Sequence, residues 1–494
     1  MTTDPRSTCI IGVAQGIVRP DDGPSPEPLD LWADVVTRAF ADTGADGVGA
    51  RVDGLQVVFC QSWDYDDPTG RLAARLGIAP RLRRYSGIGG TTPQLLVDQA
   101  AARLAAGQTS VEVVCMGEAI ATVKRSYLAG GPPAWSYPPP VKVRFPFEAP
   151  APAGEKAHKI RDAWLTFALR DVARRAAAGV DPARYQADLA VMMSRLTEVA
   201  ATNPYAWFPF EQDAAQVGEV RADNRYVAEP YTKRMCSMLD VDLSAAVVVT
   251  THEVADELGV PADRRVYLHA SAYGEDPLAI AAHPDLARSE ALPLVTGRAF
   301  GDAGVGIDDV AHLDLYSCFP ASLGFAKDAL GLADDDPRPL TVTGGLPYAG
   351  GAGSGYLVNA LAAMTTTLRD DAGSTGLVTG IGMHLTKHIA AVYSTRPPAS
   401  GTRTADLGAV CEAPVQIVDQ HEGEATVAAT AVVHGRDGEP AWAPVIVDVA
   451  PGVRTYAIST DPSWLLRAGT DEVVGTTVGV LTDPRGFNLV HPID

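Results

Sequence analysis

The chain lacks the features that would place it in a membrane or outside the cell. In its 494 residues no apolar run approaches the ~20 residues that span a bilayer. The opening, Met1-Thr2-Thr3-Asp4-Pro5-Arg6, contains neither the basic nor the apolar part of a signal peptide. The six cysteines are scattered without a Cys-x-x-Cys pair, which disfavours structural zinc. We therefore expect a cytoplasmic protein with buried free thiols, no metal centre and no membrane insertion.

Positive charge is also scarce. The chain has 40 Lys and Arg against 60 Asp and Glu, a net charge of −20, which argues against a nucleic-acid partner. Within 142–234, however, basic residues gather: Lys156, Lys159, Arg161, Arg170, Arg174 and Arg175. Such a basic island suits an anionic small ligand, and we take Lys156, Lys159 and Arg161 as cofactor-binding candidates. The alternative is a solvated helix face with ion pairs along the helix.

The expected order of elements is that of an α/β protein. Residues 9–14 and 52–59 are predicted to be buried strands, and 28–41 and 68–76 to be helices. Strands that alternate with helices predict a mostly parallel sheet with both faces covered.

A Gly-rich loop followed by an apolar helix and a strand occurs twice. The first loop is 86–93, before a strand at 111–115, and the second is 350–355, before a strand at 376–380. Two such halves predict an internally duplicated α/β fold whose loops converge on one site. Neither loop contains a cysteine or a set of metal ligands, so the chemistry is less evident than the fold.

Two regions depart from this alternation. Residues from 124 to about 225 contain loop signals and Ala-rich helices, as expected of an insertion that carries binding loops. The last 94 residues have five Arg and no Lys against thirteen Asp and Glu, with short strands typical of a small barrel. The expected division is an N-terminal half at 7–123, a loop region at 124–240, a C-terminal half at 241–395 and an antiparallel OB-type β-barrel at 401–494.

Gly89, Gly90 and Thr91 precede the first apolar helix. Backbone N–H groups at a helix N-terminus can hold a phosphate or a developing oxyanion. A tight turn that requires glycine explains the sequence equally well. Because Thr92 stands where a third glycine belongs, the loop does not match a dinucleotide-binding fingerprint.

Side chains that can move protons follow the predicted strands of the second half. Tyr316 and Cys318 lie two residues apart and can share a face, although a lone cysteine is more often a packed thiol. Tyr348 is the only titratable side chain of the longer Gly-rich run 344–355. His384 and His388 have a metal spacing if their segment is helical, but no third ligand accompanies them. The catalytic candidates are therefore Tyr316, Cys318, Tyr348 and His384, without a metal.

Taken in order, these loops resemble the thiolase superfamily over residues 7–395, especially thiolases of the sterol-carrier-protein type. The match is closest at 231–236, 315–319, 344–355 and 376–382. The resemblance implies a duplicated thiolase fold of αβαβα layers, with an inserted loop domain that holds coenzyme A. The additional C-terminal barrel looks like that of the actinobacterial "thiolase-like protein type 1" group.

The resemblance also implies that the usual nucleophile is missing. Thiolases place their nucleophilic cysteine where this chain has Gly89-Gly90-Thr91, and their oxyanion-hole histidine falls on Gly351. Their terminal Cys-x-Gly loop falls near Gly382, again without cysteine. The acid/base cysteine of the second loop is retained as Cys318, while the histidine before it is replaced by Tyr316. Without a thiolate to accept the acyl group, thiolysis and Claisen condensation have no first step.

Three functions fit this pattern, all with acyl-CoA as the ligand and all in lipid metabolism. The first is retro-aldol or other enolate chemistry on CoA thioesters, with N–H groups of Gly89–Thr91 and near Gly382 stabilising the enolate. The second is an acyl-CoA acyltransferase that uses Cys318. The third is a non-catalytic acyl-CoA-binding scaffold. The sequence does not distinguish a monomer from a homodimer.

Overall fold

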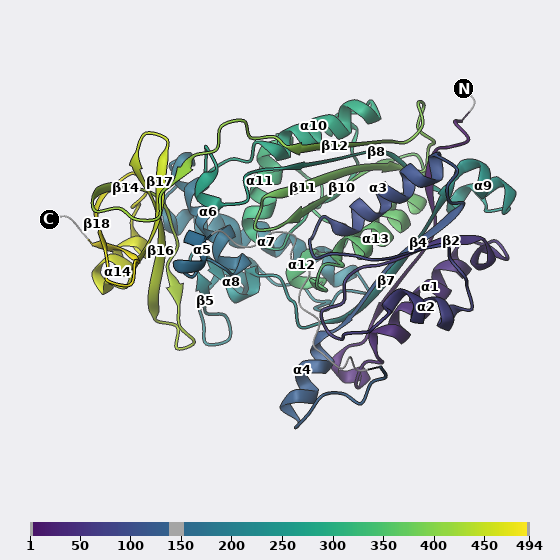
Figure 1. The fold of residues 1–494 in the computed structure, drawn as a ribbon, viewed down its shortest axis with the longest axis horizontal. Helices are drawn as coiled ribbons and strands as arrows, with labels where there is room; N and C mark the ends of the chain where they lie inside the picture. Colours follow the sequence, from purple (N-terminus) through teal and green to yellow (C-terminus); the bar gives the residue numbers. More distant parts are fainter. Residues whose placement is uncertain (1–2, 138–152, 492–494) are drawn as a thin grey trace.

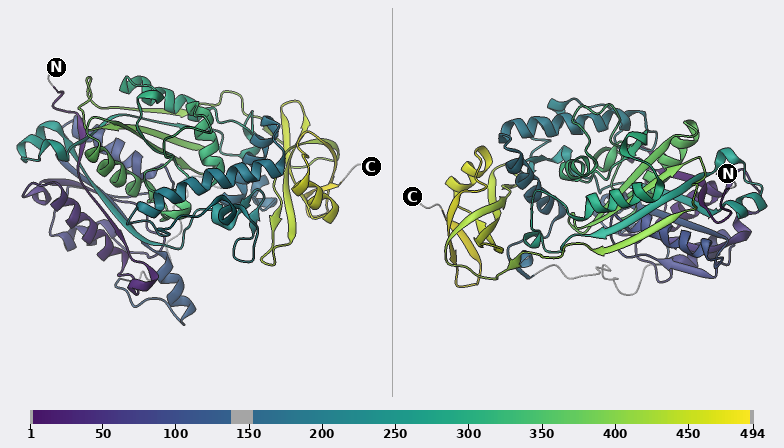
Figure 2. Two further views of the ribbon diagram at one scale, coloured as in Figure 1. Left: turned by 180° about the vertical axis from the view of Figure 1, so that it is seen from behind. Right: turned by 90° about the horizontal axis from the view of Figure 1, so that it is seen from above.

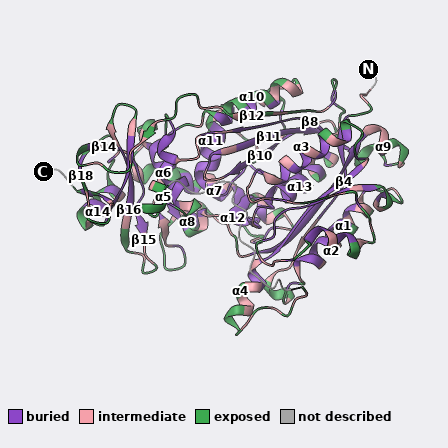
Figure 3. Cartoon of the chain, viewed as in Figure 1, coloured by how far each residue is buried: buried purple, intermediate pink, exposed green. Residues whose placement is uncertain are grey.

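The computed structural model describes residues 3–137 and 153–491, which form a mixed α/β molecule (Figure 1). Residues 138–152 of the expected loop region lie outside the described residues. Within the two described ranges, no helix combines the length and apolarity needed to cross a membrane. Buried residues are concentrated in the large sheet and in the helices beside it (Figure 3).

Both halves of the molecule repeat one strand order. The first half has the order β2 (Val52–Val57), β4 (Val111–Ala119), β7 (Asp242–Thr251), β1 (Thr8–Ile17). The second half has the order β9 (His312–Asp314), β10 (Thr375–Gly382), β11 (Lys387–Ser394), β8 (Val266–Glu275). In each half the first pair is parallel and the next two pairs are antiparallel. The predicted duplication is therefore present.

The two halves join into a 10-stranded sheet through a short contact between β1 and β8. β3 (Leu82–Tyr85), which the sequence analysis did not predict, forms the edge beside β2. Although 242–251 falls within the expected C-terminal half, β7 pairs with β4 and β1 of the first half.

The prediction of a mostly parallel sheet is wrong. Within the first half β7 runs antiparallel to both of its neighbours, and within the second half β11 does the same. β11 follows β10 after only four residues, 383–386, and so short a connection can only reverse the chain. β7 follows the long inserted region. The connection from β4 to β7 is therefore not a short helical crossover, which would make the two strands parallel.

Two helices form the central layer of the fold. α3 (Thr92–Ala105) and α13 (Tyr356–Asp370) pack against β7 and against each other. α1 (Pro28–Asp42) covers β1, and α10 (Ala291–Ala303) covers β8 (Figures 1 and 2). The apolar residues that set the helical spacing of α3 are all buried: Leu96, Val97, Ala100, Ala101 and Leu104. The expected αβαβα layers are confirmed.

The inserted region is mainly helical where it is described, with two short strands, β5 (Tyr226–Ala228) and β6 (Tyr231–Thr232), near its end. Its α-helices are α4 (Ile120–Leu128), α5 (Ala153–Ala157), α6 (Ala163–Ala178), α7 (Pro182–Thr202) and α8 (Ala214–Gly218). The basic side chains of α6 contact other elements of the fold. Arg170 is fully buried, and Arg174 and Arg175 form ion pairs with Asp328 and Glu472. These three arginines therefore connect α6 to other elements. The expected alternative, ion pairs between residues of the same helix, does not describe them.

The C-terminal region contains a closed five-stranded barrel, as predicted. The strands are β14 (Gly423–Thr430), β16 (Pro440–Ala450), β17 (Val453–Ser459), β18 (Thr477–Thr482) and β19 (Asn488–His491). β14 pairs with β16 and β18, and the pairing of β16 with β17 closes the ring. The barrel is not wholly antiparallel, because the β18–β19 hairpin returns β19 parallel to β17. Residues 403–409 form β12 (Arg403–Ala409), which joins the large sheet beside β8.

The barrel is attached to the inserted region through polar contacts. The Tyr456 hydroxyl donates to Oε1 of buried Glu155 over 2.8 Å. His434 Nε2 lies 2.7 Å from Glu229 Oε1, and Arg175 reaches Glu472. Figure 2 shows the barrel at one end of the molecule, next to the inserted helices.

Candidate functional site

The first Gly-rich loop, the end of β10 and the loop after β9 meet at Gly90. A Cβ atom added to Gly90 would lie 2.1 Å from the Ile381 carbonyl oxygen and 2.4 Å from the Tyr316 hydroxyl oxygen. No side chain fits in that space. Glycine is therefore required here by close approach, not by a positive φ angle, and Tyr316 occupies the space that a side chain at this position would enter.

The N–H groups proposed for an oxyanion hole differ in availability. Gly89 donates its N–H to Ser354 Oγ over 3.0 Å, and Gly351 donates to the Met238 carbonyl oxygen over 2.8 Å. The expectation that these two groups face a substrate is therefore wrong, since neighbouring loops already use them. The N–H groups of Gly90 and Thr91 have no acceptor among the described residues. Gly382 lies against this loop, because a Cβ added there would be 3.4 Å from Thr91 Oγ1.

Tyr316 is held by the core behind it. Its N–H donates to Thr379 Oγ1 over 2.9 Å, and its ring meets the edge of the Tyr356 ring at 5.6 Å. Tyr356 in turn donates to Asp314 Oδ1 over 2.9 Å. Burial raises the pKa of Asp314 to about 7 and raises the pKa of Tyr316 well above its usual range. Tyr316 is therefore a protonated hydrogen-bond donor at neutral pH.

Cys318 lies just before α11 (Pro320–Leu330). Its Sγ is 3.1 Å from Ser322 Oγ, and burial raises the pKa of the thiol to about 12. Burial likewise raises the pKa of Cys236 to about 12, with neighbouring Cys318 as a second cause. Although Cys318 precedes a helix, desolvation outweighs any stabilisation of the thiolate there. Both thiols stay protonated at neutral pH.

Tyr348 lines a different space from Tyr316. It ends the short helix α12 (Gly345–Tyr348) and faces a cavity of about 450 Å³ that Tyr316 and Cys318 do not line. Its buried hydroxyl and that of Ser237 have no hydrogen-bond partner among the described residues. The cavity wall also contains the aromatic rings of Phe208 and Phe210 and the thiol of Cys236. An oxygen or nitrogen atom of a ligand could therefore satisfy the two free hydroxyls.

Basic residues that the sequence analysis did not assign to a cofactor line this cavity: Lys124, Lys233 and Arg234. Lys124 pairs with Asp240 and Arg234 with Asp223, whereas Lys233 is exposed. Lys233 and Arg234 belong to the segment 231–236 that resembles thiolases, and the aromatic residues that precede it in the sequence were the signal for a binding site; no sequence signal indicated Lys124. The predicted set, Lys156, Lys159 and Arg161, is exposed and lines no part of this cavity. Lys159 Nζ lies 5.6 Å from the Trp442 ring centre, on the barrel.

His384 and His388 do not share a helix face. Met383, His384 and Leu385 have φ angles of 45°, 62° and 63° and form the turn between β10 and β11. The helical expectation is wrong because the pairing of Gly382 with Lys387 closes a hairpin here. His384 Nδ1 lies 2.9 Å from Thr166 Oγ1, and burial lowers the pKa of the imidazole below its usual value.

His388 lies on β11 and is buried, with Nε2 3.0 Å from Asp276 Oδ2. This contact fits a structural role. Within residues 3–137 and 153–491, no group of three or more His, Cys, Asp or Glu side chains could hold a metal ion.

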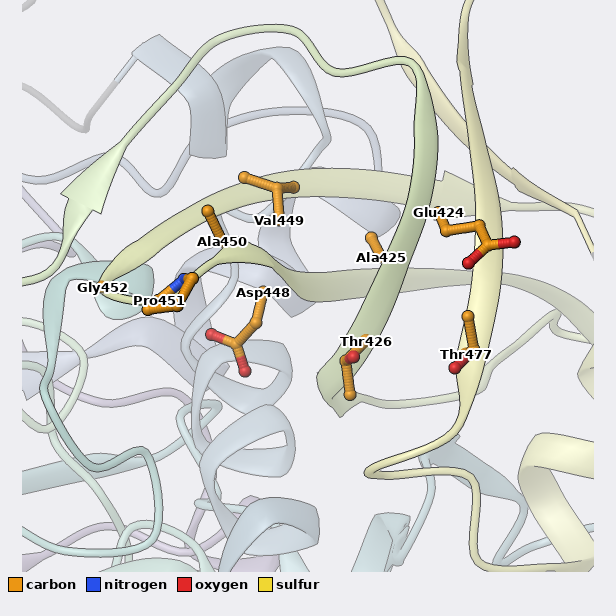
Figure 4. Close-up of a pocket in the computed structure, with 9 residues that line it drawn as sticks. All are labelled: Glu424, Ala425, Thr426, Asp448, Val449, Ala450, Pro451, Gly452 and Thr477. Carbon is orange, nitrogen blue, oxygen red and sulfur yellow. The ribbon is translucent and has the colours of Figure 1, made fainter.

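A second cavity, of about 550 Å³, lies on the barrel (Figure 4). Its acidic residues, Glu424 and Asp448, are carried by different strands and their carboxylates are far apart in the view of Figure 4. Asp448 pairs with Arg454 over 2.7 Å. The lining of this cavity contains no histidine, lysine, cysteine or tyrosine, so the chemistry is better sought around Gly90 and Tyr316.

Comparison with known proteins agrees with the fold. No family model matches the chain. The chain is 29% identical over 148 residues to the benzoylsuccinyl-CoA thiolase subunit BbsB of Thauera aromatica. That alignment covers 29% of this chain and 36% of the relative, so the chain matches only about a third of the relative's length.

Among solved structures, the chain is similar over its whole length to a monomeric SCP2-thiolase-like protein type 1 from Mycobacterium smegmatis. The TM-score is 0.83, with 27% identity and 100% of both chains covered. The Ltp2-ChsH2(DUF35) aldolase matches with a TM-score of 0.58 and 19% identity, covering 79% of this chain and 99% of that chain. An acetyl-CoA acetyltransferase from Syntrophomonas wolfei matches with a TM-score of 0.56 and 14% identity, covering 79% and 100%.

These similarities confirm the resemblance to sterol-carrier-protein-type thiolases and to the type 1 thiolase-like group. The last two matches show the fold alone, because their sequence identity is low. The chain therefore has a thiolase-like fold over its whole length.

The close approach at Gly90 predicts that replacing Gly90 and replacing Gly382 by alanine have different effects on the stability of the protein. Gly90→Ala places a methyl group against the Ile381 backbone and lowers the free energy of unfolding by about 1–3 kcal/mol. Gly382→Ala, whose nearest neighbour is 3.4 Å away, unfolds like the parent protein. Thermal unfolding of both variants measures this. Equal stability of the two variants would show that the loop does not lie against Tyr316 and β10.

Proposed function

We propose that the chain binds CoA thioesters and catalyses enolate chemistry, of the retro-aldol kind, without a covalent acyl-enzyme. The observation that carries this proposal is the close approach at Gly90. The Tyr316 hydroxyl occupies the space that a side chain at position 90 would need. The fold and the similarity to a CoA-thioester thiolase subunit support the class of ligand.

A cysteine nucleophile is disfavoured on two independent grounds. No side chain can be accommodated at Gly90, so the loop cannot present a thiol to a substrate there. Burial raises the pKa of the Cys318 thiol to about 12, so Cys318 stays protonated and is a poor nucleophile at neutral pH. We infer that Cys318 contributes packing and a weak hydrogen bond, not nucleophilic catalysis.

Retro-aldol cleavage of a β-hydroxyacyl thioester needs a base, a site for the enolate and an acid. The base removes the β-hydroxyl proton, the Cα–Cβ bond breaks, and its electron pair moves to the thioester carbonyl oxygen. The free N–H groups of Gly90 and Thr91, at the N-terminus of α3, stabilise this oxyanion. Tyr316 then donates its proton to Cα, and the protonated base returns a proton to the tyrosinate.

The cavity beside Tyr348 is the proposed entrance for the thioester. Its cations, Lys233 above all, suit the phosphates of coenzyme A, and its aromatic wall suits the apolar part of the ligand. Cys236 and Ser237 line this cavity, and the Ser237 N–H donates to the Cys318 carbonyl oxygen over 2.9 Å, which connects the cavity wall to the loop of Tyr316 and Cys318. The Ltp2-ChsH2(DUF35) aldolase, as its name states, contains a second component, and we propose a similar supporting role for the fused barrel of this chain.

Removing one hydroxyl tests the proposed reaction. Tyr316→Phe lowers kcat about 10²–10⁴-fold, because the enolate loses its proton donor. The assay follows release of acyl-CoA and a carbonyl product from a panel of 3-hydroxyacyl-CoA thioesters. Cys318→Ala serves as the matched control and retains most of the turnover. The reverse pattern, with turnover lost only in Cys318→Ala, would support an acyltransferase instead.

Two sets of charge deletions test where coenzyme A binds. Lys233→Ala weakens binding of CoA about fivefold in low salt, the effect expected of one exposed ion pair. The triple variant Lys156→Ala, Lys159→Ala, Arg161→Ala binds like the parent protein. Isothermal titration with CoA measures both. If only the triple variant loses affinity, the ligand lies on the surface near the barrel and not in the cavity.

A further inference from the structure

The turn that carries His384 has a conformation that its residues rarely adopt. Three successive non-glycine residues, 383–385, have positive φ angles, which costs conformational energy at each position. Such a turn persists only where its surroundings fix it. Arg170 Nη1 donates to the Leu385 carbonyl oxygen over 3.1 Å, and the Asp276 N–H donates to the Thr386 carbonyl oxygen over 2.7 Å. The fold therefore holds His384 in one place at the cost of local strain.

The contact with Thr166 fixes which ring nitrogen of His384 carries the proton. The Thr166 hydroxyl donates its only proton to the Ala163 carbonyl oxygen over 2.9 Å. Its oxygen, 2.9 Å from His384 Nδ1, can then only accept. Both contacts of the Thr166 hydroxyl are hydrogen bonds at the same time only if Nδ1 carries the proton of the neutral ring and Nε2 keeps a lone pair. Nε2 has no hydrogen-bond partner among the described residues.

Two contacts place this turn beside the site. Gly382, two residues before His384, lies against Gly90 and Thr91. On the other side, Phe167, which follows Thr166, packs its ring 4.9 Å from that of Phe319, which follows Cys318. Through Gly382 and through Phe167, the chain segments next to His384 and Thr166 therefore contact both the Gly90–Thr91 loop and the loop of Tyr316 and Cys318.

We propose that His384 is the proton acceptor of this site, held as the Nδ1–H tautomer by Thr166 on a turn fixed by Arg170. The proposal rests on the proposed function: Nε2 takes the β-hydroxyl proton as the Cα–Cβ bond breaks, and the imidazolium later reprotonates the Tyr316 tyrosinate. Tyr316 and Cys318 cannot accept that proton, because both are protonated at neutral pH. Thr166 and Arg170 are positioning residues.

Charged groups around the turn act on the imidazole from several elements. Asp162, before α6, favours the imidazolium, while burial favours the neutral ring and is the larger effect. Arg170 reaches the turn from α6, Lys387 on β11 pairs with Glu275, and Asp276 contacts His388. The neutral ring at pH 7 is the state in which Nε2 can accept a proton.

Nuclear magnetic resonance of the full chain with isotope-labelled histidine tests the tautomer without a substrate. The His384 signals are identified by their loss in His384→Asn. At pH 7 the parent protein shows a neutral ring protonated at Nδ1. Thr166→Val, which removes the acceptor, shifts the ring toward the Nε2–H tautomer, and Thr166→Ser retains the parent spectrum. An Nε2–H ring or an imidazolium in the parent, or no change in Thr166→Val, overturns the proposal.

Turnover supplies a second readout. In the 3-hydroxyacyl-CoA assay Thr166→Val lowers kcat with KM unchanged, and Thr166→Ser restores kcat, because only the tautomer is altered. Loss of kcat that Thr166→Ser does not restore overturns the positioning role. Titration of the same samples with CoA distinguishes a wrong positioning role from a wrong proposed function. A chain that does not bind CoA in this titration contradicts the proposed function, whichever tautomer His384 has.

Discussion

The structure of the site depends on one close approach, that of the Ile381 carbonyl and the Tyr316 hydroxyl to Gly90. The two Gly-rich loops open α3 and α13, which form the central layer between the two sheet halves, and Ser354 of the second loop accepts a hydrogen bond from Gly89 of the first. This packing leaves no room for a nucleophile at the start of α3. Within residues 3–137 and 153–491, it also leaves the backbone N–H groups of Gly90 and Thr91 without an acceptor.

Desolvation determines the chemistry that remains. Burial raises the pKa values of Tyr316, Cys318 and Cys236, so these groups donate hydrogen bonds and do not act as nucleophiles. The same effect lowers the pKa of His384 and keeps its imidazole neutral. The site therefore pairs weak acids with a neutral imidazole, a combination suited to proton transfer and enolate stabilisation and poorly suited to acyl transfer.

The sequence predicted much of the architecture because periodic burial and repeated Gly-rich loops are local signals. The direction of the strands was not predictable in this way. The pattern of apolar residues does not show how the chain runs between β4 and β7, or that it reverses between β10 and β11. The turn at His384 was not predictable from the sequence either. Its three residues with positive φ angles are held by hydrogen bonds from Arg170 and Asp276, which lie far away in the sequence. The N–H groups of Gly89 and Gly351 donate to Ser354 and Met238, which are also distant in the sequence, so these hydrogen bonds were not predictable.

The most direct test of the central claim is the intact mass of the protein after incubation with acetyl-CoA and with a 3-ketoacyl-CoA, followed by peptide mapping. Binding of CoA is checked in the same samples. A site without a nucleophile predicts bound ligand and no covalent adduct. An acyl group on Cys318 would contradict the account, because it would show that a buried thiol with a raised pKa nevertheless carries the acyl intermediate.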